Sequence, residues 1–208
     1  TPYGQVVSKP RIERVIKEIY EFSDYHKRLQ TVKVFNLDQE KNKLPFRKGL
    51  ALMPAKFGIS FNKPSFNQAG ALVHVYSDGS VRLNHGGTEM GQGLFIKVAQ
   101  VVAECFKIPL EQIHITSTNT AEVPNTSATA ASSGSDLNGI AAWDATSKIK
   151  NRMINHVSQL FQKQKSEIAF ENGRIIAGNK SLLFSELAHS CWENRISLSS
   201  TGFYKTPK

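Results

Sequence analysis

A stretch of 19 residues, AGALVHVYSDGSVRLNHGG (69–87), constrains the fold more than any other part of the chain. Two runs in which apolar and polar residues alternate flank the dipeptide Asp78-Gly79. Because this dipeptide tolerates the positive φ angles of a tight turn, the pattern predicts a β-hairpin. The hairpin leads through a glycine-rich loop into residues 91–106. Apolar residues recur there at helical spacing and predict a helix: Leu94, Val98, Val101, Val102 and Cys105.

The C-terminal half adds further helices and strands. Pro109 ends the first helix, and residues 112–115 indicate a strand. Residues 136–165 contain no proline and indicate a long helix, and residues 184–191 a short one. A weaker pair of strands flanks the turn at 171–173. The order hairpin-helix-strand-helix-strand predicts an α+β fold in a two-layer arrangement, with the helices on one face of the sheet.

Residues 1–48 differ in pattern from the rest and predict an N-terminal helical segment. Apolar residues on one face of 10–22 predict an amphipathic helix. The stretch 36–48 is polar and contains a proline, which predicts a surface connection.

Short apolar runs follow this connection, at 49–53 and 58–61 on either side of Pro54. They predict one interrupted strand. We therefore expect two parts, an N-terminal helix and connection at 1–48 and an α+β domain at 49–208.

The formal charge of +9 raises the question of nucleic-acid binding. Residues 1–50 carry 11 Lys/Arg against 6 Asp/Glu, and residues 141–208 carry 10 against 5. Residues 51–140, which hold the glycine-rich loop, carry 5 against 6. Basic and aromatic residues do not interleave as they do in single-strand-binding surfaces. The charge pattern therefore predicts solvated faces and no nucleic-acid partner.

The sequence also argues against a membrane protein and a disulfide-rich one. No apolar run approaches the roughly 18 residues of a membrane span, and the N-terminal residues lack the apolar block of a signal peptide. Two cysteines are too few for a disulfide framework or a zinc site, which favours a reducing, cytoplasmic setting. The histidines that we considered as metal ligands lack ligand spacing: His74, His85, His114 and His156.

The loop 86–93 allows two interpretations. Its glycines permit close backbone approach, and the first amides of the following helix lack partners within the helix, so an anion could bind there. The alternative is a tight turn without a ligand. The loop lacks the Gly-Lys-Ser/Thr of a phosphate-binding P-loop and the third glycine of a Rossmann motif.

The stretch 116–135 is half Ser or Thr, 10 residues of 20. A flexible linker is one interpretation. The other is a binding loop, because the hydroxyl groups just before the long helix lie beside its free amides and could donate to a phosphate or a heterocycle. Together with the glycine loop it would suit a large anionic cofactor.

Two segments carry a resemblance to a known family: GGTEMGQGL (86–94) and VPNTSATAAS (123–132). Together with KFGISF (56–61), FNQAGALVHVYSDGSV (66–81) and SLSSTGFYKTP (197–207), they resemble the molybdenum-binding subunit of xanthine dehydrogenases. The resemblance covers nearly the whole chain. It implies an internal segment of the region that binds the molybdenum-molybdopterin cofactor.

The resemblance also implies cofactor-binding residues. In the family the methionine and glutamine of TEMGQGL contact the pterin, which here implies Met90, Gly91 and Gln92. The TAAS segment implies Thr129, Ala131 and Ser132, with Ala131 against the molybdenum centre. The family has a serine where this chain has Gly134, so Ser133 or Ser135 would have to replace that contact. The resemblance supplies no proton-abstracting base, and Glu89 is expected to be structural.

Substrate residues follow from the GISF motif. Its phenylalanine stacks on the purine in the family, which implies Phe61. The next residue is Asn62, where vertebrate members have threonine, so this substrate contact is altered.

The implied reaction is oxidation of hypoxanthine and xanthine to urate. Iron–sulfur clusters and FAD are expected on other segments or subunits, so the partners would be the remainder of the large subunit, the iron–sulfur/FAD part and the purine. We expect this chain alone to hold no cofactor and to be inactive. Alternatives are an aldehyde oxidase-type molybdenum hydroxylase and a non-catalytic anion-binding or assembly module.

Overall fold

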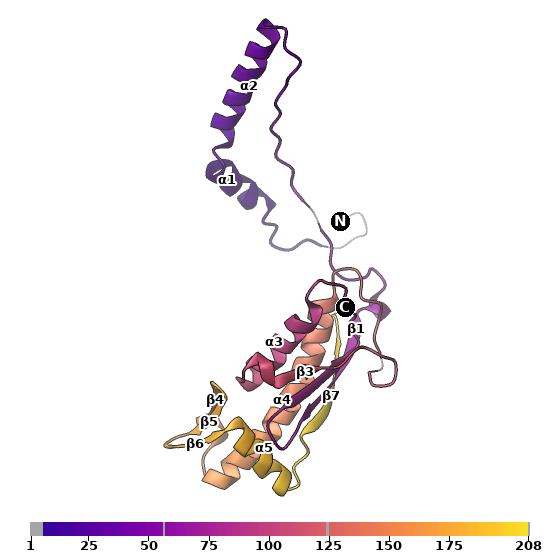
Figure 1. The fold of residues 1–208 in the computed structure, drawn as a ribbon, viewed down its shortest axis with the longest axis vertical. Helices are drawn as coiled ribbons and strands as arrows, with labels where there is room; N and C mark the ends of the chain where they lie inside the picture. Colours follow the sequence, from indigo (N-terminus) through magenta and orange to yellow (C-terminus); the bar gives the residue numbers. More distant parts are fainter. Residues whose placement is uncertain (1–5, 56, 124, 208) are drawn as a thin grey trace. The chain divides into compact units, whose positions relative to one another are not determined.

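The computed structural model describes residues 6–55, 57–123 and 125–207. The chain divides into two compact units, residues 1–57 and residues 58–208 (Figure 1). Each unit is described by itself.

The smaller unit contains two helices, α1 (Ile12–Phe22) and α2 (Tyr25–Lys41). The chain then turns back, and the side chain of Asn36 on α2 exchanges two hydrogen bonds with the backbone of Lys48: Asn36 Nδ2 donates to its carbonyl and its amide donates to Asn36 Oδ1. The helix over 10–22 is confirmed. The connection at 36–48 is wrong in its first part, because α2 continues to Lys41.

The strand expected at 49–53 and 58–61 is also wrong. Neither run pairs with another strand, and both are irregular. An extended apolar segment becomes a strand only when a neighbouring backbone supplies its hydrogen bonds, and a single sequence does not reveal that neighbour.

The larger unit contains a four-stranded sheet in the order β3-β2-β1-β7. Strands β1 (Gln68–Val75) and β2 (Val81–His85) form the hairpin predicted from the sequence, and Gly79 at its turn has φ 86°. Strand β7 (Ser199–Lys205) pairs antiparallel with β1, and β3 (Ile113–Ile115) pairs parallel with β2.

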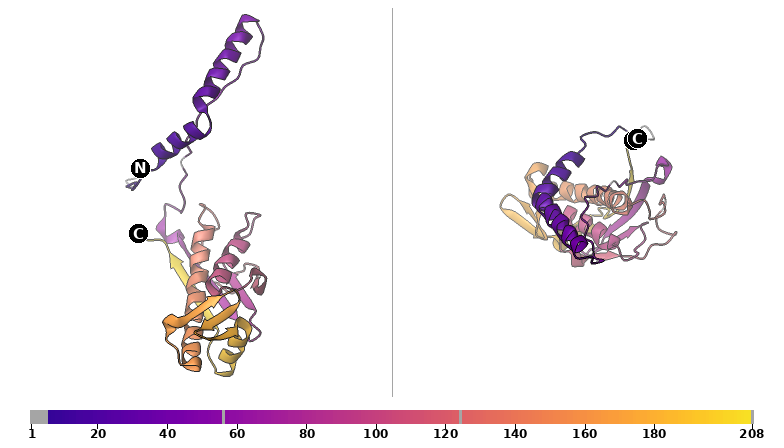
Figure 2. Two further views of the ribbon diagram at one scale, coloured as in Figure 1. Left: turned by 90° about the vertical axis from the view of Figure 1, so that its left-hand side faces the viewer. Right: turned by 90° about the horizontal axis from the view of Figure 1, so that it is seen from above.

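Two helices, α3 (Leu94–Phe106) and α4 (Gly134–Phe161), lie side by side across one face of this sheet (Figures 1 and 2). Val98 and Val102 of α3 and Ala141 and Ile149 of α4 are fully buried in the shared core. The α+β fold with a helical layer on one face is therefore confirmed. Helix α3 starts at Leu94 because Gly91 and Gly93 have positive φ angles, and it ends before Pro109 because Lys107 is left-handed.

A small second sheet follows α4, in the order β4-β5-β6. Strands β4 (Ile168–Glu171) and β5 (Arg174–Ala177) confirm the strand pair that the sequence predicts, and β6 (Lys180–Leu183) was not predicted. Helix α5 (Phe184–Glu193) confirms the short helix. The described part of this unit also contains three short 3₁₀ helices: η1 (Pro64–Phe66), η2 (Leu110–Gln112) and η3 (Lys165–Glu167). Within the part of the chain that the structure describes, no helix is both long and apolar enough to cross a membrane.

Candidate functional site

The glycine loop between β2 and α3 is held by one of its own acidic side chains. Glu89 Oε1 accepts hydrogen bonds from the amides of Gly91 (2.8 Å) and Gly93 (3.0 Å), and Oε2 accepts one from Phe95 (3.0 Å). These bonds, the one from Phe95 first, hold the pKa of Glu89 below its usual value. One amide of this helix start, that of Phe95, is therefore already bonded, because the chain supplies its own carboxylate there.

Gln92 holds the other half of the same loop. Its Oε1 accepts from the Met90 amide and its Nε2 donates to the Thr88 carbonyl (2.9 Å). The Met90 side chain remains 66% exposed. The loop thus has a fixed backbone path and presents a large apolar side chain outward.

The Ser/Thr-rich stretch is docked against this loop, so the flexible-linker interpretation is wrong. Thr129 Oγ1 accepts from the Thr88 amide (2.8 Å), and Thr118 Oγ1 donates to the Gly87 carbonyl (2.6 Å). A Cβ atom on Gly86 would lie 1.8 Å from Thr126 Oγ1, so the two segments touch where glycine leaves room. The two motifs therefore form one surface.

The turn before α4 has an unusual backbone. Ala131 and Ser132 are both left-handed, with φ 53° and 51°. Ser133, which precedes α4, is 2% exposed and donates its hydroxyl to the Ala130 carbonyl (3.0 Å). Its side chain therefore caps none of the first amides of α4. Unlike α3, this helix begins without a side-chain acceptor among the described residues.

A cleft of about 380 Å³ lies where the two loops and the two helix starts meet. It joins four of the residues implied by the sequence, Met90, Gln92, Thr129 and Ser132. Gly91 and Ala131 belong to the same two loops but do not line the cleft. The remaining lining residues are Leu94, Lys97, Ala130, Gly134 and Ser135.

Lys97 is the site residue that the sequence analysis missed. It is the only basic residue of α3 and lies one turn into the helix, on the side that faces the cleft. Its position one turn after the glycine loop was the available signal. The cleft therefore combines a cation with the uncapped start of α4, which suits a negatively charged group.

Phe61 and Asn62 lie next to this site but do not line the cleft. The amide of Ser60 donates to the Ala131 carbonyl (2.9 Å), which ties the segment before Phe61 to the turn before α4. Buried Asn67 fixes the backbone of Phe61 by accepting from its amide (2.8 Å) and donating to its carbonyl (2.6 Å). Asn62 is exposed.

His85, at the end of β2, contacts the backbone of the glycine loop with its buried side chain. It is 1% exposed, and its Nδ1 accepts from the Gly87 amide (3.1 Å), while its Nε2 has no partner among the described residues. Burial lowers the pKa of His85 to about 4. His85 is therefore a neutral structural residue, and within the described ranges no group of three or more His, Cys, Asp or Glu could hold a metal ion.

Acidification is expected to destabilise the larger unit through His85. Its folded pKa of about 4 lies below the usual 6.5, so the unfolded state binds the proton first. Stability that is present above pH 6.5 is then lost as the pH falls towards 4, by roughly 3 kcal/mol at about 1.4 kcal/mol per pKa unit. Urea unfolding of the chain between pH 7 and pH 4 measures this, beside His85→Asn, which keeps an acceptor for Gly87. Equal pH dependence in both proteins would show that other groups are responsible.

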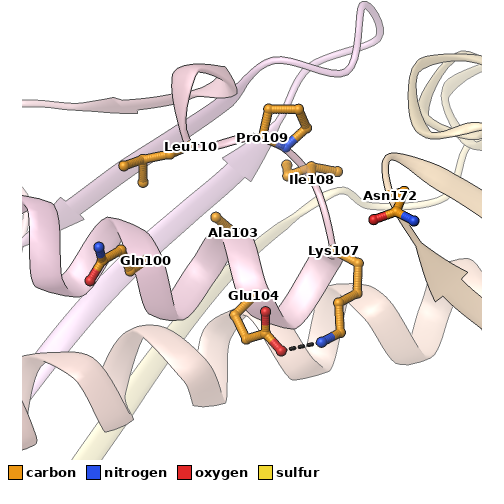
Figure 3. A pocket seen from close by; sticks show the side chains of 8 residues that line it. All are labelled: Gln100, Ala103, Glu104, Lys107, Ile108, Pro109, Leu110 and Asn172. Carbon is orange, nitrogen blue, oxygen red and sulfur yellow. Dashed lines mark hydrogen bonds and ion pairs between the residues drawn. The ribbon is translucent and has the colours of Figure 1, made fainter.

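A larger cavity, about 640 Å³, lies at the opposite end of α3 (Figure 3). Its two charged side chains, Glu104 and Lys107, form an ion pair with each other. The other lining residues are Gln100, Ala103, Ile108, Pro109, Leu110 and Asn172. Because its charges neutralise each other, this cavity offers less to a charged ligand than the smaller cleft.

Known proteins are similar to this chain over its whole length. The family model of the molybdopterin cofactor-binding domain matches residues 18–208. The chain is 41% identical over 207 residues to xanthine dehydrogenase of Dictyostelium discoideum and 42% identical over 207 residues to xanthine dehydrogenase/oxidase of Mus musculus. All of this chain is covered in both matches, but it spans only 14% of the length of each of these relatives.

Solved structures share the fold at lower identity. Reconstituted CO dehydrogenase from Oligotropha carboxidovorans matches 95% of this chain and 26% of its own with a TM-score of 0.76 at 20% identity. Quinoline 2-oxidoreductase from Pseudomonas putida 86 matches 68% of this chain and 19% of its own with a TM-score of 0.60, also at 20% identity. The family model covers most of the chain, and its matched residues include both loops of the cleft. The chain therefore belongs to the molybdopterin cofactor-binding domain family.

Proposed function

We propose that the cleft between the starts of α3 and α4 binds the molybdenum-molybdopterin cofactor. Met90, Gly91 and Gln92 form one side of the site. Thr129, Ala131 and Ser132 form the other. The observation that carries the proposal is the hydrogen bond from the Thr88 amide to Thr129, because it joins the two motifs at the edge of one cleft.

The residues present fit such a group. The cofactor carries a phosphate, which the uncapped amides of α4 and the ammonium of Lys97 suit, while Asp136 adds one negative charge to the first turn of α4. Ser135 lines the cleft, whereas Ser133 is buried and bonded to Ala130. We therefore assign to Ser135 the contact that Gly134 cannot make. When bound, the cofactor would supply the oxidation–reduction chemistry, and Ala131 would be the residue beside its molybdenum.

The complete protein is proposed to be a molybdenum hydroxylase that oxidises hypoxanthine and xanthine to urate. The names of the relatives support this substrate. The hydrogen bond from the Ser60 amide to the Ala131 carbonyl supports a role of Phe61 and Asn62 beside the cofactor. In this assignment residues 49–208 are the cofactor-binding part and residues 1–48 a separate N-terminal element. The remainder of the large subunit and an iron–sulfur/FAD part complete the enzyme. The free thiols of Cys105 and Cys191 suit a reducing, cytoplasmic setting.

The test is metal analysis of the complete protein followed by steady-state assays with xanthine and with aromatic aldehydes. We expect one molybdenum per chain and a higher kcat/KM for xanthine. Molybdenum with preferred aldehyde turnover would reassign the substrate. A complete protein without molybdenum would mean that the domain is an anion-binding or assembly module. The 208-residue chain alone is expected to hold no cofactor and to show no turnover.

In the complete protein, Gln92→Ala is expected to lower molybdenum content about tenfold. The substitution removes the acceptor of the Met90 amide and the donor to the Thr88 carbonyl, so the wall of the cleft loses its shape. Lys107→Ala, on the exposed far end of α3, is the control and should retain its molybdenum. Equal, full molybdenum in both variants, measured by elemental analysis, would contradict the assignment of loop 86–93.

A further inference from the structure

We infer that Glu89 is a positioning residue for the cofactor, which acts by locking the glycine loop and takes no proton from the substrate. The effect that we infer on cofactor binding rests on the proposed function. The lock, by which we mean the hydrogen bonds that hold the glycine loop to Glu89, rests on the geometry alone.

The lock is built from a single carboxylate. Both oxygens of Glu89 are used, in three hydrogen bonds of 2.8 to 3.0 Å to the amides of Gly91, Gly93 and Phe95. Gly91 and Gly93 have φ angles of 91° and 73°. Glycine adopts such angles freely but loses much conformational entropy when it is fixed there. The loop therefore needs an added interaction to keep its path, and the charged acceptor at the helix start supplies it.

The neighbours of Glu89 show what the lock achieves. Met90 and Gln92 line the cleft, whereas Glu89, which directly precedes Met90, does not. Its carboxylate faces the start of α3 instead. The side chain thus fixes the loop on one side while the residues next to it are presented on the other.

The Glu89 carboxylate also makes the start of α3 less suited than the start of α4 to bind an anionic ligand. With Glu89 bonded to the Phe95 amide at the start of α3, that amide is not available to a second anion, and the negative charge disfavours one nearby. Helix α4 begins without a side-chain acceptor among the described residues, and Lys97 lines the same cleft as Gly134 and Ser135 of α4. An anionic part of the cofactor is therefore directed to α4.

A role as general base does not suit this geometry. A base needs a free lone pair directed at the substrate, within hydrogen-bond reach of the proton that it takes. The Glu89 oxygens face three backbone amides, which also lower the pKa of Glu89 and make it a weaker base.

The experiment compares Glu89→Gln and Glu89→Ala in the complete protein, with Glu104→Gln at the other end of α3 as control, since Glu104 pairs only with exposed Lys107. Three quantities are measured: hydrogen exchange of the amides in 90–95, molybdenum per chain, and kcat per bound molybdenum across pH. We expect Glu89→Ala to exchange at least about tenfold faster and to lose most of its molybdenum. Glu89→Gln keeps one acceptor oxygen and should recover much of both. In all variants kcat per molybdenum and its pH profile should stay within about twofold of wild type.

Two results would overturn the inference. One is unchanged exchange and full molybdenum in Glu89→Ala. The other is a fall of about 10² or more in kcat per molybdenum in Glu89→Gln, which is the signature of a lost base. Absence of molybdenum from the wild-type protein would refute the proposed function, while the exchange data would still decide whether Glu89 locks the loop. Glu89→Gln keeps the test informative if Glu89→Ala does not fold.

Discussion

Gly202→Ala is expected to unfold the larger unit or to leave it marginally stable. A Cβ atom at this position would lie 1.9 Å from the Ala141 carbonyl oxygen and 2.6 Å from the Ala145 amide nitrogen. Both are backbone atoms in the middle of α4, so no side-chain rotation relieves the clash. Separating β7 from α4 would also break the bond from the Phe203 amide to Asp144 (3.1 Å). We expect a loss of more than about 3 kcal/mol, a large share of the usual 5–15 kcal/mol.

The measurement is urea unfolding of the 208-residue chain, followed by circular dichroism. Gly139→Ala is the matched control, because Gly139 lies on α4, the helix that Gly202 contacts, and a Cβ there makes only an ordinary contact of 3.6 Å with Val101. Helix propensity should make that variant as stable as wild type or more so, by about 0.5–1 kcal/mol. If Gly202→Ala unfolds at the same urea concentration as Gly139→Ala, β7 does not pack on α4 as described.

The second large effect concerns Gly86→Ala in the complete protein. The added methyl group would overlap Thr126, whose Oγ1, Cγ2 and Cβ atoms lie 1.8, 2.3 and 2.5 Å from the new Cβ. Thr126 belongs to an irregular segment that can shift, so we expect a modest loss of stability. The shift would separate the two walls of the cleft, however, and molybdenum content should fall at least about tenfold.

A double substitution tests this explanation. Thr126→Gly removes all three clashing atoms, so Gly86→Ala/Thr126→Gly should recover a good part of the molybdenum that Gly86→Ala loses. Thr126→Gly alone provides the reference. Additive losses in the double variant would mean that the two segments do not touch at this point.

The sequence predicted those parts of the fold whose signals are local. The hairpin depends on Asp78-Gly79, and α3 depends on regular apolar spacing, so both follow from neighbouring residues. Strand β7 has no such signal, because its sequence SSTGFYK is largely polar and Gly202 is there to let α4 approach. Helix α2 was missed because its apolar residues do not lie on one face, and Val34 and Leu37 are exposed.

Four of the cofactor residues expected from the sequence line the cleft, but the internal bonds of the site were not predicted. The resemblance of 86–94 and 123–132 to a known family placed Met90, Gln92, Thr129 and Ser132 in one site, and the cleft brings these four together. It did not predict that Glu89 occupies the start of α3, since a carboxylate six residues before Phe95 can reach its amide only when both glycines turn the loop back.

The left-handed backbone before α4 limits which amino acids can vary there. Side chains branched at Cβ are strongly disfavoured at positive φ, so Val, Ile and Thr are poor replacements for Ala131 or Ser132 whatever lies in the cleft. Gly, Asn and Asp are the residues that this backbone accepts most readily. A survey of natural variants of this chain should therefore find only a few amino-acid types at positions 131 and 132. Because backbone geometry alone restricts the residue types at these two positions, their invariance would be weak support for a ligand contact. Exchange among the accepted residue types should have little effect on the stability of the fold.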